Sequence, residues 1–258
     1  MIDATAPIGA ASMEMTPIGG DTPVLRLDRL AVAPAGVAKP VLEGVSLDLH
    51  PGESVALVGP SGSGKTTLLR TIATLLRPLA GTATIAGINP AALEGEELRR
   101  LRCRIGMVTQ RGDLVGPLRV DQNVMAGALG RWSNWRALRF LLRPTPAELE
   151  EARVALAAVG LEHKLFSRAS QLSGGEQQRV AIARLLVQAP LLLLADEPVA
   201  SLDPANARKI LDLLSSLARV RRMGIIMSLH QPDLAWAFCD RVFALSDGRL
   251  KQVTPGHE

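Results

Sequence analysis

The sequence is poor in aromatic residues and contains no tyrosine, since Phe and Trp together make up 3% of its 258 residues. It has two cysteines, Cys103 and Cys239, which are far apart and lack the close spacing of metal ligands. We therefore interpret them as two buried thiols in a reducing compartment.

Long apolar runs are also missing. The strand-like run Leu191–Ala195, like every other apolar run in the sequence, is far shorter than the roughly 20 residues that cross a bilayer. The first 21 residues contain no Lys or Arg and lack the basic start and apolar core of a signal peptide. We expect residues 1–22 to be a disordered N-terminal extension and residues 23–258 to form the folded domain.

The excess of positive charge is small. Lys and Arg number 29 against 25 Asp and Glu, which gives a net charge of +4. This balance favours anionic ligands or a membrane surface, but it is too weak to indicate DNA or RNA. We expect no nucleic-acid partner.

The most informative stretch is Gly59–Thr67, which reads Gly-Pro-Ser-Gly-Ser-Gly-Lys-Thr-Thr. An apolar run typical of a strand, Ser54–Val58, precedes it, and Leu68–Leu76 follows with apolar residues at helical spacing. Strand, glycine loop and helix in this order form the context in which Gly-x4-Gly-Lys-Thr binds phosphate. A glycine-rich turn with a chance lysine is the alternative, and the flanking strand and helix disfavour it.

The chemistry of this loop follows from its residues. Its glycines let successive N–H groups point at phosphate oxygens, and the positive end of the next helix adds to the attraction. Lys65 can reach the β- and γ-phosphates as a point charge, and Thr66 offers a hydroxyl to Mg²⁺. The candidate nucleotide-binding residues of the loop are Gly59, Pro60, Ser61, Gly62, Ser63, Gly64, Lys65, Thr66 and Thr67.

The order of strand and helix patterns predicts an α/β fold. Buried apolar strands alternating with helices indicate a P-loop NTPase core with a mostly parallel sheet. Val24–Val32 and Val41–Leu49 alternate apolar and polar residues and predict an N-terminal antiparallel β subdomain. The sequence between Gln110 and Gln188 has helical patterns almost throughout, which predicts an inserted lobe at about 111–180. Asp247-Gly248 predicts a C-terminal hairpin.

Two carboxylates, Asp196 and Glu197, end the apolar strand Leu191–Ala195. Beside a phosphate loop, Asp196 is placed to hold Mg²⁺, directly or through water. Glu197 is then the candidate general base that polarises the attacking water. Two exposed loop acids are the alternative.

Leu172–Glu176 reads Leu-Ser-Gly-Gly-Glu and opens a predicted helix, Glu176–Gln188. Ser173 is a favourable N-cap, and Gly174 and Gly175 expose backbone N–H groups at a helix N-terminus. Taken alone, this stretch is an ordinary capped helix.

Taken in order, these stretches resemble the motifs of ABC transporter ATPase subunits. Gly59–Thr66, Gln110, Leu172–Glu176, Leu191–Glu197, Ser201–Asp203 and His230 are similar to that family's Walker A, Q-loop, signature, Walker B, D-loop and switch-histidine motifs. The resemblance covers about 24–253. It implies that two copies bind two ATP molecules head to tail, each between Lys65 of one chain and Ser173, Gly174, Gly175 and Glu176 of the other.

The resemblance also implies roles for single residues. Gln110 would contact Mg²⁺ or the attacking water, His230 the γ-phosphate, and Asp203 would act across the dimer. Asp203 is also a natural N-cap before Pro204, and both roles can hold.

The sequence departs from the family pattern at two places. Glu176 replaces the commoner Gln of the signature, from which we expect a small effect. The stretch Ala31–Gly36 lacks the aromatic residue on which the family usually stacks adenine, which leaves Val32 or Pro34 for this role. We therefore predict weak discrimination between ATP and GTP.

Three longer stretches, 123–135, 195–204 and 228–234, look like phosphonate importer ATPases. This resemblance implies a transport-coupled ATPase with ATP and Mg²⁺, transmembrane permease subunits, a periplasmic or lipid-anchored binding protein, and a peripheral location on the cytoplasmic face of the inner membrane. The alternatives are an ATPase of another ABC complex, such as an exporter or a lipoprotein-release system, and a soluble ABC component of a carbon–phosphorus lyase complex.

The predicted lobe carries four arginines, Arg131, Arg136, Arg139 and Arg143, with no acid among them. They predict either contact with the permease or lipid headgroups, or a solvated helix face. Trp132 and Trp135 lie three residues apart and can share a helix face, and we expect them to pack inside the lobe.

Overall fold

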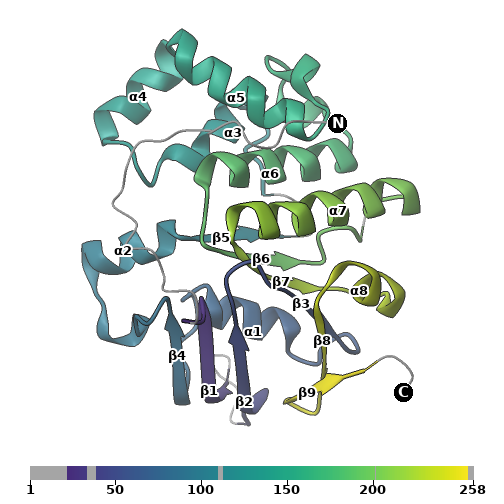
Figure 1. Ribbon diagram of the computed structural model, residues 1–258. Coiled ribbons are helices and arrows are strands. Elements are labelled where there is room, and N and C mark those ends of the chain that lie inside the picture. The colour runs from purple at the N-terminus through teal and green to yellow at the C-terminus, as the bar shows by residue number, and fades with distance from the viewer. Residues whose placement is uncertain (1–21, 34–38, 110–112, 201, 255–258) are drawn as a thin grey trace. The chain divides into compact units, whose positions relative to one another are not determined.

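A computed structural model describes residues 22–33, 39–109, 113–200 and 202–254 (Figure 1). Contacts divide the chain into two compact units, a helical unit of residues 108–190 and a β-rich unit made from the segments on either side. The helical unit is therefore an insertion between two halves of the β-rich unit.

The β-rich unit contains two sheets. The smaller sheet has the order β2-β1-β4, and its central strand β1 (Leu25–Val32) pairs antiparallel with β2 (Leu42–Leu49) and β4 (Ala80–Ile85). The larger sheet has the order β5-β6-β7-β3-β8-β9. Its strands are β3 (Ser54–Val58), β5 (Ile105–Val108), β6 (Leu192–Asp196), β7 (Gly224–Ser228), β8 (Arg241–Ser246) and β9 (Arg249–Val253).

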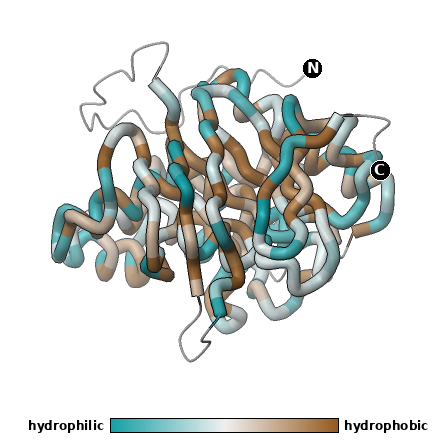
Figure 2. Tube along the Cα trace, turned by 90° about the horizontal axis from the view of Figure 1, so that it is seen from below, coloured by the Kyte–Doolittle hydropathy of each residue, from teal (hydrophilic) through white to brown (hydrophobic). Residues whose placement is uncertain are grey.

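The centre of the larger sheet is parallel. Strand β3 pairs in parallel with β7 and β8, and β6 pairs in parallel with β7, whereas β8 and β9 form an antiparallel hairpin. Strand β7 is buried along its whole length, as expected for a strand covered on both faces. In contrast, β1 alternates buried and exposed residues, and Figure 2 shows such alternation along the chain as successive brown and teal segments.

Helices cover the larger sheet. In Figure 1 α7 (Pro204–Arg221) lies above this sheet and α1 (Lys65–Ile72) below it, where α1 contacts β1, β6 and β7. The remaining helices of the unit are α2 (Gly95–Cys103), α8 (Pro232–Phe238) and the 3-10 turn η1 (Pro90–Ala92). Leu25, Leu57, Leu68 and Leu194 belong to one fully buried cluster, so α1 and both sheets share a core.

The helical unit is built around α6 (Gly174–Gln188), which contacts α3 (Val120–Met125) and α5 (Pro146–Ala158). It also contains α4 (Asn134–Leu142) and three 3-10 turns, η2 (Ala126–Ala128), η3 (Glu162–Lys164) and η4 (Ala169–Gln171). Thr145 caps α5 and Ser173 caps α6, each in a capping box with a glutamate three residues on.

The observed architecture confirms the predicted fold class, and most elements lie where their patterns predict. The helix predicted at Leu68–Leu76 instead runs from Lys65 to Ile72, and Thr74 follows in a left-handed conformation (φ 63°) that no helix can continue. Helix α3 is short, and the chain continues directly from it into the 3-10 turn η2. There Gly127 lies so close to α6 that a Cβ would be 2.2 Å from the Arg184 carbonyl oxygen.

The prediction of two buried thiols is only partly right, because Cys103 and Cys239 are both half-buried. Burial nonetheless raises the pKa of the Cys239 thiol to about 12. None of the helices in the described ranges is long and apolar enough to span a bilayer.

Candidate functional site

The glycine loop joins the end of β3 to the start of α1. Gly59 has φ 148°, and a Cβ there would lie 2.3 Å from the Leu245 carbonyl oxygen, so only glycine fits. The residue before α1 is Gly64, which has no side chain to cap the helix. In contrast, serine, threonine or aspartate side chains cap α4, α5, α6 and α7. The first N–H groups of α1 therefore remain for an anion.

Lys65 lies inside the loop rather than in solvent. Its ammonium donates to the carbonyl oxygens of Gly59 at 2.8 Å and Pro60 at 3.0 Å, and the residue is 6% exposed. The loop thus holds one buried positive charge close to the uncapped N-terminus of α1. Both features attract a polyanion such as a triphosphate.

Asp196 connects the loop to the neighbouring strands. Its Oδ2 accepts a hydrogen bond from the Thr66 hydroxyl at 2.9 Å, and its Oδ1 accepts one from the Ser228 hydroxyl at 2.8 Å. The structure thereby brings together the two residues that the sequence predicts as Mg²⁺ ligands in this unit. Ser228 was not among the predicted site residues, although a single hydroxyl in the otherwise apolar strand β7 was a signal for it.

Glu197 follows Asp196 with φ 53°, a left-handed conformation that is uncommon for a residue with a side chain. Its N–H donates to the Ser228 hydroxyl at 2.9 Å, and its Oε1 lies 2.5 Å from His230 Nε2. The candidate general base and the candidate switch histidine are therefore in direct contact.

The sheet topology explains why these residues meet. Strands β6, β7 and β3 are neighbours and run in parallel, so their carboxyl ends lie at one edge of the sheet. Asp196 and Glu197 follow β6, His230 follows β7, and Gly59 follows β3. An edge formed by such carboxyl ends is where open α/β sheets bind ligands.

Ser173–Glu176, by contrast, belongs to the helical unit. The Ser173 hydroxyl accepts the Glu176 N–H at 3.3 Å, and Glu176 Oε2 accepts the Ser173 N–H at 2.9 Å. These hydrogen bonds, together with Lys164 at 3.6 Å, lower the pKa of the Glu176 carboxyl. The unusual Glu of this stretch is thus held as a carboxylate at the start of α6.

Asp203 is the N-cap of α7, as the sequence predicts. Its carboxylate accepts the Asn206 N–H at 3.1 Å and the Asn206 side-chain amide at 2.6 Å, and these bonds lower its pKa. Gln110 and Ser201 lie outside the described residues.

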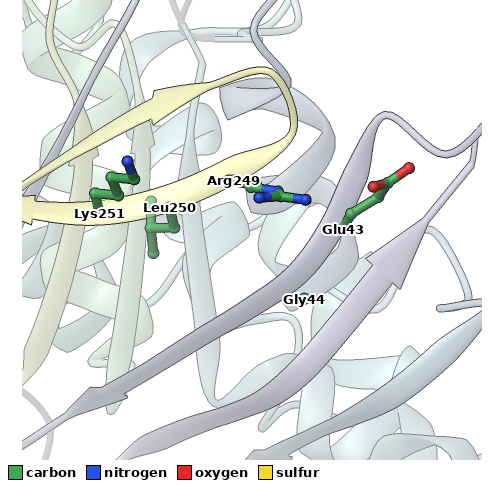
Figure 3. A pocket seen from close by; sticks show the side chains of 5 residues that line it. All are labelled: Glu43, Gly44, Arg249, Leu250 and Lys251. Atoms are coloured by element: carbon green, nitrogen blue, oxygen red, sulfur yellow. The ribbon is translucent and has the colours of Figure 1, made fainter.

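The sequence Ala31–Gly36, at the end of β1, contains no aromatic residue on which the base of a nucleotide could stack. The side chain of Val32, one candidate for adenine contact, is fully buried and so has no free face to offer. The other candidate, Pro34, lies outside the described residues. Figure 3 shows a hollow lined by Glu43 and Gly44 from β2 and by Arg249, Leu250 and Lys251 from β9. It includes no residue of the phosphate loop, so we do not assign the nucleotide to it.

Ion pairs partly neutralise the basic stripe of the lobe. Arg136 and Arg139 both pair with Glu148, at 3.2 and 2.5 Å, and Arg131 pairs with Glu151. Burial raises the pKa of Glu148, but hydrogen bonds from Thr145 and from the two arginines outweigh this effect and lower it. Three of the four arginines are therefore bound to α5.

The two tryptophans do not share a helix face. Helix α4 begins at Asn134, so Trp132 precedes the helix, and a spacing of three residues does not place the two side chains on one helix face. Trp132 is buried with its ring 5.2 Å from that of Phe140, which agrees with packing inside the lobe. Trp135 instead is 75% exposed, and with the exposed Leu138 and Leu142 it forms an apolar stripe, hereafter the α4 stripe.

The donors at the sheet edge fit Mg²⁺. The Thr66 hydroxyl and the Asp196 carboxylate are oxygen donors, which Mg²⁺ prefers, and few protein ligands suffice because Mg²⁺ commonly keeps waters and binds substrate phosphates. Within the described ranges no cluster of three or more His, Cys, Asp or Glu could hold a metal by itself.

A strand, glycine loop and helix with acidic residues at the adjacent strand end define a P-loop nucleotide-binding protein. The family model described as ABC transporter matches residues 42–200, and the chain belongs to this family. A phosphonates import ATP-binding protein, PhnC, of Cupriavidus pinatubonensis is 45% identical over 214 residues, which cover 81% of this chain and 75% of that protein. The protein of the same name from Pseudomonas fluorescens is 46% identical over 209 residues, covering 81% and 78%.

Solved structures agree with this assignment. The chain is similar to the dimeric post-hydrolysis state of the ATP-binding cassette MJ0796 bound to ADP and Pi, with a TM-score of 0.75 and 30% identity over 91% of this chain and all of that one. It is also similar to cbiO1 from Clostridium perfringens, part of the ABC transporter complex cbiONQ, with a TM-score of 0.77 and 28% identity over 91% and 90% of the two chains.

Proposed function

We propose that this chain is the ATP-hydrolysing subunit of an ABC importer for phosphonates or related phosphorus oxyanions. The observation that carries the ATPase is the linked group of Thr66, Asp196, Glu197 and His230 beside the uncapped N-terminus of α1. The observation that carries the substrate class is the 41–46% identity to phosphonates import ATP-binding proteins from several bacteria and an archaeon.

The arrangement supports the following roles. The loop N–H groups and Lys65 bind the phosphates of ATP, while Thr66 and Asp196 hold Mg²⁺, which neutralises charge on the β- and γ-phosphates when bound. Glu197 orients and polarises the attacking water, and His230 fixes the direction of the Glu197 carboxylate through their contact. Gln110 remains a proposed contact to the metal or the water.

The site is completed by a second copy of the chain in this proposal. Ser173 and the N–H groups of Gly174 and Gly175 form a second anion-binding helix start, and they belong to the helical unit rather than to the unit that carries the loop. ATP would lie between the loop of one copy and this helix start of the other, with Asp203 near the dimer interface. The similarity to a dimeric cassette bound to ADP and Pi supports this assembly.

The partners would be permease subunits in the inner membrane and a periplasmic or lipid-anchored binding protein, with this chain on the cytoplasmic face. Ion pairing of the lobe arginines disfavours them as the permease contact. We assign this contact to the α4 stripe, whose members at i, i+3 and i+7 lie on one helix face and leave apolar surface in water.

Reconstitution tests this proposal. The chain is purified with the permease and placed in liposomes, and ATP hydrolysis is measured with the binding protein loaded with methylphosphonate, phosphate, sulfate or no anion. We expect methylphosphonate to stimulate hydrolysis most, and Glu197→Gln to abolish the stimulation. The alternative, a soluble ABC component of a carbon–phosphorus lyase complex, would be supported by either of two results. One is hydrolysis that does not change when the binding protein is added, and the other is co-purification with carbon–phosphorus lyase proteins and no permease.

A further inference from the structure

Ser228 is the last residue of β7 and the only polar one in this strand. It is 0% exposed, yet its hydroxyl makes two hydrogen bonds. It donates to Asp196 Oδ1 at 2.8 Å and accepts the N–H of Glu197 at 2.9 Å. The parallel register, in which Asp196 pairs with Ser228, places the hydroxyl beside both acidic residues.

We propose that Ser228 is a positioning residue that holds the metal-binding carboxylate of Asp196 and the backbone of Glu197 in their working geometry. This inference rests on the proposed ATPase function. A hydroxyl suits the task because it donates and accepts at once, as a carboxylate and an N–H at the same point require.

The first part of the task is to orient Asp196. Each of its two carboxylate oxygens accepts a hydrogen bond from a different residue, Oδ1 from Ser228 on β7 and Oδ2 from Thr66 on α1. Rotation of the carboxylate about its own axis would break both bonds. Ser228 therefore keeps Oδ2 directed at the Thr66 hydroxyl, which is where the metal would bind. Hydrogen bonds to a ligating group commonly tune metal affinity by about 10- to 100-fold.

The second part is to hold the strained backbone of Glu197. A residue with a side chain in the left-handed conformation persists where its surroundings over-determine it, and such residues cluster at active sites. Here the Ser228 hydroxyl accepts the Glu197 N–H and so stabilises φ 53°. This conformation directs the Glu197 side chain to His230, the residue two positions after Ser228, at 2.5 Å.

Removing the hydroxyl would leave the Asp196 carboxylate and the Glu197 N–H, both half-buried, without this partner. In Ser228→Ala, the Asp196 carboxylate keeps only its Thr66 bond, and the Glu197 N–H loses its acceptor. The effect should appear as weaker metal binding and slower hydrolysis, because both acids become free to reorient. Binding of nucleotide without metal should not change, because the Ser228 hydroxyl bonds to Asp196 and Glu197, whereas the Lys65 ammonium is held by the carbonyl oxygens of Gly59 and Pro60.

Ser215→Ala provides a matched control in the same unit. Ser215 is a buried serine of α7 whose hydroxyl donates to the Phe238 carbonyl at 2.8 Å, and it contacts none of the proposed catalytic residues. Ser215→Ala therefore measures the loss of stability when a buried serine hydrogen bond is removed and the bonds to Asp196 and Glu197 stay in place. Ser228→Thr retains the hydroxyl and should restore function in part. Ser228→Cys keeps the side-chain size and takes the place of the alanine variant if that variant does not fold.

The experiment measures Mn²⁺ binding by electron paramagnetic resonance in the presence of ADP, the Mg²⁺ dependence of ATP hydrolysis, ADP binding in EDTA, and thermal unfolding. For Ser228→Ala we expect the Mn²⁺ Kd and the half-saturating Mg²⁺ concentration to rise about tenfold or more, and kcat to fall by about 10- to 100-fold. ADP binding in EDTA should stay unchanged, and Ser215→Ala should show wild-type metal binding.

Two results would overturn the inference alone. One is Ser228→Ala with wild-type metal dependence and kcat, and the other is an equal loss in Ser215→Ala, which would reduce the effect to fold stability. A wild-type chain that hydrolyses no ATP would instead overturn the proposed function, and this inference with it. The wild-type control therefore separates the two failures.

Discussion

Gly174→Ala tests the proposed division of the site between two copies of the chain. Gly174 is the first residue of α6, and a Cβ placed on it would meet no atom of the described residues within 4 Å. Its φ also lies outside the left-handed region. The part of the chain that the structure describes therefore leaves room for an alanine at this position.

The magnitudes follow from this open space. Alanine is favoured over glycine in a helix by about 0.5–1 kcal/mol, and less at its first position. The unfolding temperature should thus rise, by no more than about 2–4 °C. If the phosphate of ATP bound to the partner fills the space, the same Cβ displaces it from the helix N–H groups. Loss of one such donor typically slows catalysis by about 10²- to 10³-fold.

The assay combines thermal unfolding, ADP binding by the isolated chain and steady-state ATP hydrolysis. We expect unchanged folding, unchanged binding by the loop, and hydrolysis reduced at least 100-fold. Gly116→Ala is the control, because a Cβ there makes only an ordinary contact of 3.7 Å with Ser170. It should leave hydrolysis unchanged.

Hydrolysis close to wild type in Gly174→Ala would show that no phosphate approaches this helix start, and the two-copy site would have to be abandoned. A drop in unfolding temperature of many degrees would show instead that Gly174 has a role within its own chain. The two measurements therefore separate an intermolecular effect from a local one.

Three further predictions concern the catalytic acid, the base of the nucleotide and the lobe. Glu197→Gln should bind ATP and dimerise but hydrolyse little, because only the carboxylate that polarises water is lost, and near-normal phosphate release would contradict its role. GTP should support turnover within about tenfold of ATP, because base stacking on an aromatic residue, worth about 1–3 kcal/mol, is missing, and a strong ATP preference in competition assays would refute this. Glu148→Gln should destabilise the lobe by about 1–2 kcal/mol, because the bonds from Arg136 and Arg139 lose their charged acceptor. The pKa of Glu148 is lowered in the folded chain, so its stabilisation is present above its ordinary pKa of 4.5 and lost as pH falls through the folded value. Between pH 7 and pH 3, the free energy of unfolding measured with denaturant should therefore fall less in Glu148→Gln than in the wild type. An equal fall in both proteins would contradict the reasoning.

Local patterns were sufficient for most of the fold. Strand β3 lies where its apolar run predicts, and α7 begins directly after the predicted N-cap Asp203, because a proline or glycine at a boundary acts through its own backbone. Glu148 shows the limit of such patterns. Its ion pairs with Arg136 and Arg139 depend on how α4 packs against α5, which the spacing within either segment does not predict.

The glycine loop, the two acids after β6 and the family could all be predicted from the sequence, because each depends on residue types at fixed spacing along one segment. Only the tertiary structure decided that Ser228 lies between Asp196 and Glu197, and that Asp196 reaches Thr66. These contacts join residues far apart in the chain, and they exist because β6, β7 and β3 are neighbours in one parallel sheet. The register between strands is a property of the packed sheet, and no single segment encodes it.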